Sequence, residues 1–149
     1  NDNHGHALGD QVLKAVAQTL KNQLRNIDMV FRYGGEEFIA VLTDTREDGA
    51  YHVAERIRQN VAALNIRHRE SPTATHITVS IGGAVINHTA GTHLRDQINA
   101  ADKALYAAKR GGRNRVEAAE ELPLSLENWR RKTAGLPASA RQKPVTARA

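Results

Sequence analysis

The sequence predicts an α+β fold, in which helices flank a mainly antiparallel central sheet. Apolar residues recur at steps of three and four in residues 8–25, 47–64 and 93–110, which is the pattern of amphipathic helices. Between the first two segments, a Gly-Gly pair separates two short apolar runs, which is typical of a β-hairpin. Between the last two, residues 76–86 alternate between apolar and polar side chains, as in a half-buried strand.

The first helix is expected to turn one apolar face toward the core. The inward positions within residues 8–25 are Val12, Leu13, Val16, Ala17, Leu20 and Leu24. Asp10 would lie in the first turn, where a carboxylate is favoured by the positive end of the helix dipole.

The hairpin carries acidic residues at its tip. Residues 29–31 and 38–42 are its strands, and the two glycines between them are expected to supply the positive φ angles of a two-residue turn. Glu36 and Glu37 follow directly, and two carboxylates at a tight turn repel each other unless a cation neutralises them. The pattern is that of either a Mg²⁺ site near a bound phosphate or an ordinary solvated polar turn.

The second helix follows a turn at residues 43–47, which is expected to cap its N-terminus. Its buried stripe is Ala54, Ile57, Val61 and Leu64.

The remaining segments complete the sheet. In the strand at residues 76–86, the glycines at 82 and 83 indicate a bulge or the close approach of another backbone. The third helix ends at the glycines at 111 and 112, and residues 113–118 are expected to form a last short strand.

Composition restricts the class of protein. The 149 residues fit one domain, and the absence of cysteine excludes disulfides and thiolate metal sites. No run of about 18 apolar residues and no signal peptide is present, which predicts a cytoplasmic domain. The net charge of +5 owes much to residues 120–149, which hold 6 basic and 3 acidic residues. Residues 1–119 are nearly balanced, so we expect no nucleic-acid partner.

Three blocks of sequence, in this order, resemble the signature segments of the GGDEF family, the diguanylate cyclases. They are NDNHGHALGD at residues 1–10, GGEEF at 34–38 and ADKALYAAKRGGRN at 101–114. The family patterns are N-D-x-x-G-H-x-x-G-D, the GGDEF loop and A-D-x-A-L-Y-x-A-K-x-x-G-R-N. The resemblance covers residues 1–118, which we expect to be the family domain, and residues 119–149 are expected to be a basic, largely disordered tail.

The resemblance implies a fold of the nucleotidyl cyclase and polymerase-palm type. In the family, a strand ending in D-x-D-x-F-K precedes the block that begins here at Asn1, and it supplies a metal-binding aspartate. No equivalent stands in this sequence. We therefore expect the chain to be truncated at its N-terminus and to lack a central strand, so that the isolated piece is poorly stable.

The activity that the resemblance implies is the condensation of two GTP into cyclic di-GMP, with release of two pyrophosphates. Two protomers of a homodimer would face each other, and an upstream sensor would bring them together. Mg²⁺ or Mn²⁺ would neutralise the triphosphate. Glu36 is the expected metal ligand, and Glu37 would support a second metal or the attacking hydroxyl.

The resemblance assigns six residues to GTP: Asn1, Asp10, Gly34, Gly35, Lys109 and Arg113. Asn1 and Asp10 would hydrogen-bond the guanine edge. The two glycines would leave room for a phosphate or ribose above the turn. Lys109 and Arg113 would reach the β- and γ-phosphates, although cations at this position also complement the C-terminus of a helix.

A product-inhibition site is implied by Arg25 and Asp28, an R-x-x-D pair six positions before Gly34. In the family, these residues bind a cyclic di-GMP dimer, and Arg56 is the candidate for the additional arginine. An R-x-x-D pair alone is commonly an ordinary ion pair at a helix end. The seven histidines have no spacing that indicates zinc and are expected to be surface or capping residues.

Two functions of different classes follow. The first is an active diguanylate cyclase domain in bacterial second-messenger signalling. The second is a catalytically inactive receptor that binds GTP or cyclic di-GMP. The intact GGEEF block favours the enzyme, together with Asn1, Asp10, Lys109 and Arg113. The missing D-x-D segment is the argument against it.

Overall fold

The predicted α+β fold is confirmed by the structure, a computed structural model that describes residues 2–68, 74–85 and 94–119 and, for residues 2–7, the backbone alone. The elements are α1 (Asp2–Gln23), β1 (Met29–Gly34), β2 (Glu37–Val41), α2 (Glu47–Ala63), β3 (Ile81–Gly83), α3 (Leu94–Arg110) and β4 (Val116–Ala118). Ala119, the first residue of the predicted tail, is instead buried, and its N–H donates a hydrogen bond to the Gly83 carbonyl oxygen. Residues 120–149 of that tail lie outside the described residues. No helix within them is long and apolar enough to cross a membrane.

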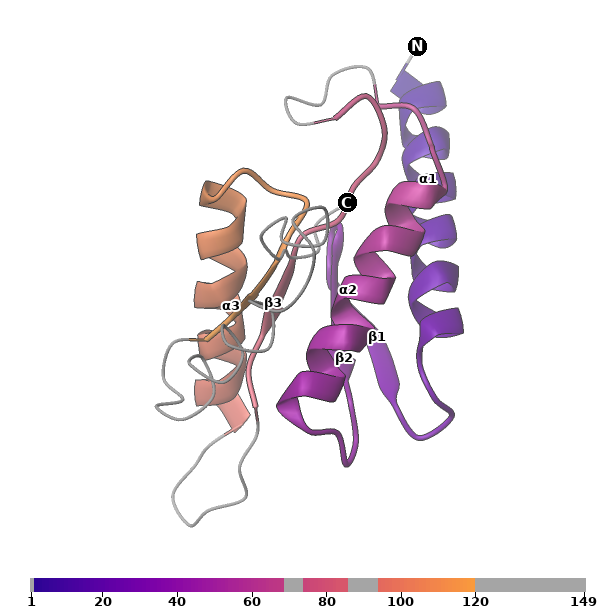
Figure 1. Ribbon diagram of the computed structural model, residues 1–149. Helices are drawn as coiled ribbons and strands as arrows, with labels where there is room; N and C mark the ends of the chain where they lie inside the picture. The colour runs from indigo at the N-terminus through magenta and orange to yellow at the C-terminus, as the bar shows by residue number, and fades with distance from the viewer. Residues whose placement is uncertain (1, 69–73, 86–93, 120–149) are drawn as a thin grey trace, which may run out of the picture.

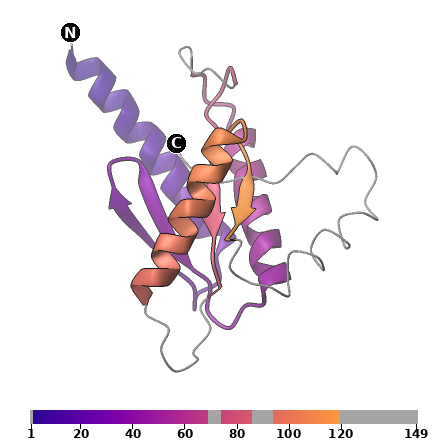
Figure 2. The same ribbon diagram turned by 90° about the vertical axis from the view of Figure 1, so that its left-hand side faces the viewer.

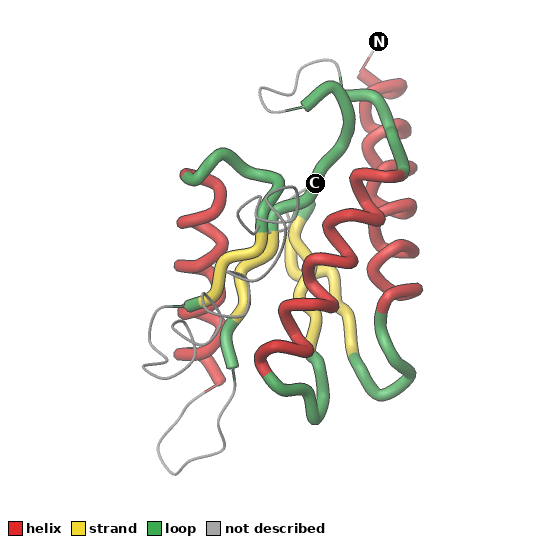
Figure 3. The backbone as a smooth tube through the Cα atoms, viewed as in Figure 1, coloured by secondary structure: helices red, strands yellow, loops and turns green. Residues whose placement is uncertain are grey.

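The strands form two pairs between two helical layers. β1 and β2 pair antiparallel, and β3 and β4 pair parallel. Figure 1 shows α1 and α2 side by side on one side of the strands and α3 on the other, and Figure 2 shows α3 crossing in front of the strands. In the tube view of Figure 3 the two strand pairs are separate, and no described strand joins them.

The core lies where α1 and α2 pack on the segment that leads into β3. Its buried members are Val16, Leu20, Ile57, Val61, Ile77 and Val79. The inward positions predicted for α1 and α2 are therefore largely confirmed. Leu64 is the exception, because α2 ends one residue earlier and the Leu64 side chain is 38% exposed.

The start of α1 differs from the prediction. The helix begins at Asp2 instead of residue 8, and it continues through Gly5 and Gly9. A helix tolerates each glycine at a cost of about 1 kcal/mol. Asp10 therefore lies about two turns inside the helix and not in its first turn, so the helix dipole does not explain a carboxylate at this position.

The turn of the hairpin lies one residue later than predicted. Gly34 still pairs with Glu37, and the ladder shifts register between Arg32 and Gly34. The two turn residues are thus Gly35, with a φ of 27°, and Glu36. The irregularity at the end of β1 takes up the extra residue, which moves the first carboxylate of the pair from the strand into the turn.

β3 is shorter than the predicted strand at residues 76–86. Residues 77–80 have no strand partner in the described chain, although Ile77 and Val79 are buried as the alternation predicted. The predicted close approach at the glycines is confirmed at Gly82, which lies against the backbone of Ala101 and Leu105 in α3. The buried face of α3 consists of Ala100, Ala104 and Ala108, and these small side chains allow the helix to lie close to the strand.

The last strand begins at Val116, not at residue 113. Arg113 and Asn114 have φ angles of 57° and 45°, which belong to the left-handed region and cannot continue a strand. The residues after α3 therefore form a tight turn, and only then does β4 run beside β3.

Candidate functional site

A side-chain contact connects the hairpin to the C-terminal part of α3. Lys109 Nζ lies 3.7 Å from Glu37 Oε1, with side chains that are 20% and 37% exposed. The pair joins the third signature block to the second across 72 positions of sequence. A cation held beside a carboxylate suits a ligand that carries phosphate oxygens and a metal ion together.

The turn residues leave the space above them open. A Cβ built on Gly34 or Gly35 meets no atom within 4 Å. Arg32 stabilises the turn, because its Nε and Nη2 donate hydrogen bonds of 3.0 and 2.6 Å to the carbonyl oxygen of Gly35. Glu36 is exposed at the tip. The glycine positions are thus compatible with a ligand above the turn.

A cavity of about 340 Å³ opens between α1 and the hairpin. Asp10 is one of its lining residues, and the surface of the cavity is mainly apolar. The other lining residues are Leu13, Lys14, Ala17, Val30, Phe31, Arg32 and Phe38. An apolar slot with a carboxylate at its edge suits a flat heterocycle whose edge carries N–H donors.

Arg113, the second predicted phosphate cation, is exposed in the turn that follows α3. Its backbone N–H donates a 3.1 Å hydrogen bond to the carbonyl oxygen of Ala108. The structure therefore brings Glu37, next to Glu36 in sequence, into contact with Lys109. It places Arg113 four positions after Lys109, in the turn that follows α3. Asn1, the other predicted guanine contact, lies outside the described residues.

The described residues contain no group of three or more His, Asp or Glu side chains that is arranged to hold a metal ion. The two tip carboxylates are nonetheless hard oxygen donors of the kind that Mg²⁺ and Mn²⁺ prefer. They are compatible with a metal ion that takes its remaining ligands from other groups.

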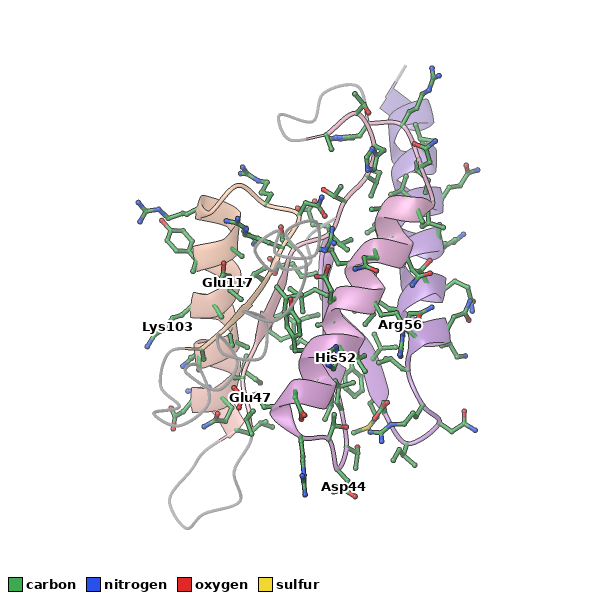
Figure 4. All side chains as sticks on the ribbon, in the orientation of Figure 1. Asp44, Glu47, His52, Arg56, Lys103 and Glu117 are labelled. Atoms are coloured by element: carbon green, nitrogen blue, oxygen red, sulfur yellow. The ribbon has the colours of Figure 1, made fainter. Side chains whose placement is uncertain are left out.

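Arg25 and Asp28 form a clasp at the opposite end of the hairpin, which Asp44 marks in Figure 4. Asp28 Oδ1 accepts from Arg25 Nη2 at 3.0 Å and from the Thr43 backbone at 3.1 Å. Arg25 Nη2 also donates to the Thr43 carbonyl and to Thr45 Oγ1, both at 2.6 Å. The Asp28 side chain is only 2% exposed, against 53% for Arg25. The pair is therefore more than a local ion pair, because it joins the loop after α1 to the loop before α2.

Arg56 lies at the same end of α1. Figure 4 shows Arg56 on the side of α2 that faces α1. Its Nε donates to Gln23 Oε1 at 2.8 Å, and its Nη2 donates to the Gln23 carbonyl at 2.7 Å. Gln23 precedes Arg25 by two positions, so the structure brings the three predicted inhibitory residues to one region.

The clasp predicts a pH dependence of stability. The hydrogen bond from Arg25 is the largest cause that lowers the pKa of Asp28 below its usual value of 3.8. A lowered pKa in the folded state stabilises the fold above the unfolded-state pKa, and this contribution disappears as the pH falls through the folded-state pKa. We expect Asp28→Asn to lower the free energy of unfolding by on the order of 1 kcal/mol at pH 7, and by less at pH 3. Urea titrations at both pH values test this, and an equal loss at both would contradict it.

Comparison with known proteins identifies the family. The sequence profile described as diguanylate cyclase, GGDEF domain, matches residues 1–115. The chain belongs to the GGDEF family. Its GGEEF block, the cavity beside Asp10 and the end of α3 are thus parts of a GGDEF domain.

Two curated relatives are named as diguanylate cyclases. The GGDEF domain described here is 44% identical to diguanylate cyclase DosC of Escherichia coli over 117 residues, which is 78% of this chain and 25% of that protein. It is 44% identical to diguanylate cyclase A of Treponema denticola over 116 residues, 78% of this chain and 30% of that protein. The chain thus spans about a quarter of the length of these relatives.

Solved structures of GGDEF domains share the fold. The active GGEEF domain of a diguanylate cyclase from Vibrio cholerae is 37% identical, with a TM-score of 0.68 over 81% of this chain and 74% of that chain. The GGDEF domain of DgcB from Caulobacter crescentus, in complex with c-di-GMP, is 38% identical, with a TM-score of 0.68 over 81% of this chain and 70% of that chain.

Sequence reasoning missed several residues around the site. Arg32 supports the GGEEF turn, Thr43 and Thr45 complete the clasp, and Arg58 contacts Asn114 in the turn after α3. The spacing of three positions between Glu55 and Arg58 is a local signal from which their ion pair on α2 could have been predicted. No sequence signal indicated the more distant partners.

Proposed function

We propose that this chain is the catalytic domain of a diguanylate cyclase, which condenses two GTP into cyclic di-GMP and two pyrophosphates. The observation that carries the proposal is the meeting of Lys109 with Glu37 at the open GGEEF turn, next to a cavity that Asp10 borders. In this proposal the cavity receives the base, Lys109 binds phosphate oxygens and the carboxylates of the turn hold a metal ion. These three tasks correspond to the parts of a metal-bound nucleoside triphosphate.

Each side chain has a separate task in this proposal. Asp10 accepts hydrogen bonds from the ring N–H and the amino group of guanine, and Asn1 is proposed to donate to the same edge. Lys109 and Arg113 bind the β- and γ-phosphates, which orients the α-phosphate toward the partner protomer. The glycines at 34 and 35 allow the substrate to lie against the turn.

Glu36 and Glu37 would hold Mg²⁺ or Mn²⁺ together with an aspartate from a strand before Asn1. Such an ion, when bound, neutralises phosphate charge and lowers the pKa of an attacking hydroxyl. The chain's own contribution is to fix the two carboxylates. Arg32 holds the turn, and the ion pair with Lys109 keeps Glu37 near the phosphates.

Two protomers are required, because the 3′-hydroxyl of each GTP attacks the α-phosphate of the other. We propose a homodimer in the cytoplasm, brought together by a sensor region of the same protein. Product inhibition is assigned to Arg25 and Arg56, with Asp28 holding Arg25 in place. An Arg25→Ala variant that cyclic di-GMP inhibits as strongly as the wild type would contradict this assignment.

The role of Asp10 predicts a loss of base discrimination. Inosine triphosphate lacks the exocyclic amino group of guanine, so the wild-type protein should prefer GTP. We expect Asp10→Ala to weaken GTP binding by about 10- to 100-fold, the value of a hydrogen bond to a charged group, and to weaken inosine triphosphate binding less. Competition binding with both nucleotides measures this. Lys14→Ala, which changes another exposed residue at the cavity, is the control and should keep the preference.

A further inference from the structure

We propose that Arg58 of α2 is a positioning residue for the phosphate-binding turn after α3, and that it acts through Asn114. The inference rests on the proposed function, which assigns Arg113 to the phosphates of GTP. Arg58 itself belongs to none of the three signature blocks and lies outside the cavity and the hairpin tip.

The turn after α3 has a backbone that needs support. Gly112, Arg113 and Asn114 have successive φ angles of 108°, 57° and 45°. The left-handed region costs a residue with a side chain about 1 to 2 kcal/mol, although asparagine tolerates it better than most. Two non-glycine residues in succession therefore persist only where surrounding contacts hold them.

Arg58 supplies such a contact from another layer of the fold. Its Nη1 donates a 3.0 Å hydrogen bond to Asn114 Oδ1, across 56 positions of sequence. Its Nε donates to Glu55 Oε2 at 2.9 Å on the preceding turn of α2. The carboxylate thus fixes one edge of the guanidinium, and the other edge is directed at Asn114.

The surroundings of this contact are partly shielded from water. The side chains of Arg58 and Glu55 are 19% and 22% exposed. Burial, followed by the nearby charge of Glu55, raises the pKa of Tyr51 in the same cluster to about 12. A charge-assisted hydrogen bond is stronger in such surroundings than on an open surface.

The contact determines where Arg113 can reach. Asn114 directly follows Arg113 in the chain. The N–H of Arg113 donates a hydrogen bond to the carbonyl oxygen of Ala108 at the end of α3. With both sides of Arg113 fixed, its side chain leaves the turn in one direction. Without the Arg58 contact, the turn is free to relax toward negative φ, and the Arg113 side chain would leave the turn in another direction.

Two pairs of variants in the intact protein test the inference. Asn114→Gly keeps a left-handed backbone but removes the acceptor, whereas Asn114→Asp retains an acceptor. Arg58→Met removes the donor, whereas Arg58→Lys retains a charge without the fork. We expect Asn114→Gly and Arg58→Met to weaken GTP binding by about tenfold, with Asn114→Asp near the wild type. Thermal unfolding identifies any variant that fails to fold. The Asn114→Gly variant retains the ion pair between Arg58 and Glu55 on α2.

The readouts separate positioning from general destabilisation. Guanosine monophosphate lacks the β- and γ-phosphates, so its affinity should not change in either variant. In an Arg113→Ala background, Asn114→Gly should cause no further loss of GTP affinity. A loss of GMP affinity equal to that of GTP, or additive losses in the double variant, would overturn the inference. A wild-type protein that binds GTP no better than GMP would overturn the proposed function, and this inference with it.

Discussion

Replacing Glu36 with alanine in the intact protein is expected to reduce cyclic di-GMP formation by about 10²-fold or more, the scale of losing one electrostatic group from an active site. Glu36 is exposed in the turn and belongs to no part of the core, so the fold should survive. Glu37 is less informative for this purpose, because its removal also takes the ion-pair partner from Lys109. Initial rates at saturating GTP with Mg²⁺ measure the effect.

Asp96→Ala is the matched control for this experiment. Asp96 is an exposed carboxylate in the first turn of α3, at the opposite end of the helix from Lys109. Its loss removes only a helix-dipole interaction of about 0.3 to 1 kcal/mol. Unchanged turnover in Asp96→Ala and a large loss in Glu36→Ala are expected. Full activity in Glu36→Ala would remove the tip carboxylate from the mechanism.

Gly82→Ala is expected to lower the free energy of unfolding more than a glycine-to-alanine substitution at any other glycine of the described strands. A Cβ at Gly82 would overlap the carbonyl oxygen of Ala101 and the amide nitrogen of Leu105, and would lie 2.9 Å from Leu105 Cα. All three atoms belong to the backbone of α3, so no side chain can rotate away. Overpacking of a core costs about 1 to 3 kcal/mol, and a backbone collision lies at or above the upper end.

The neighbouring glycine provides the control. A Cβ at Gly83 would have its nearest contact at 3.8 Å, from the Glu117 carbonyl oxygen, which is ordinary van der Waals distance. Chemical unfolding should therefore show a large loss for Gly82→Ala and a small change for Gly83→Ala. Similar losses for both would mean that β3 and α3 are not in the close contact that the Ala100, Ala104 and Ala108 face allows.

The helices could be predicted from sequence because their signal is local. The predicted range 47–64 differs by one residue from α2, and α3 extends over all the described residues of the predicted range 93–110. Apolar steps of three and four residues define a helix without reference to the rest of the chain. The start of α1 was wrong because its first turns carry glycines and polar residues with no apolar periodicity. The predicted start of the last strand was wrong because nothing local indicated two left-handed residues at Arg113 and Asn114.

The site was predictable only in part, for the same physical reason. The signature blocks indicated Asp10, Lys109 and the GGEEF residues, and the R-x-x-D spacing indicated an ion pair that the structure contains. The partners of these residues are set by tertiary packing. Glu37 meets Lys109, Arg25 meets Thr43 and Arg58 meets Asn114 across 72, 18 and 56 positions of sequence, and no periodicity encodes such distances.

The most direct test of the central claim is the product formed from GTP and Mg²⁺ by the intact protein, separated by chromatography with cyclic di-GMP and pyrophosphate as standards. The proposed function predicts cyclic di-GMP with two pyrophosphates for each molecule formed, and no product when a chelator removes the metal. A protein that binds GTP or cyclic di-GMP yet releases neither product would contradict the cyclase and identify a nucleotide receptor.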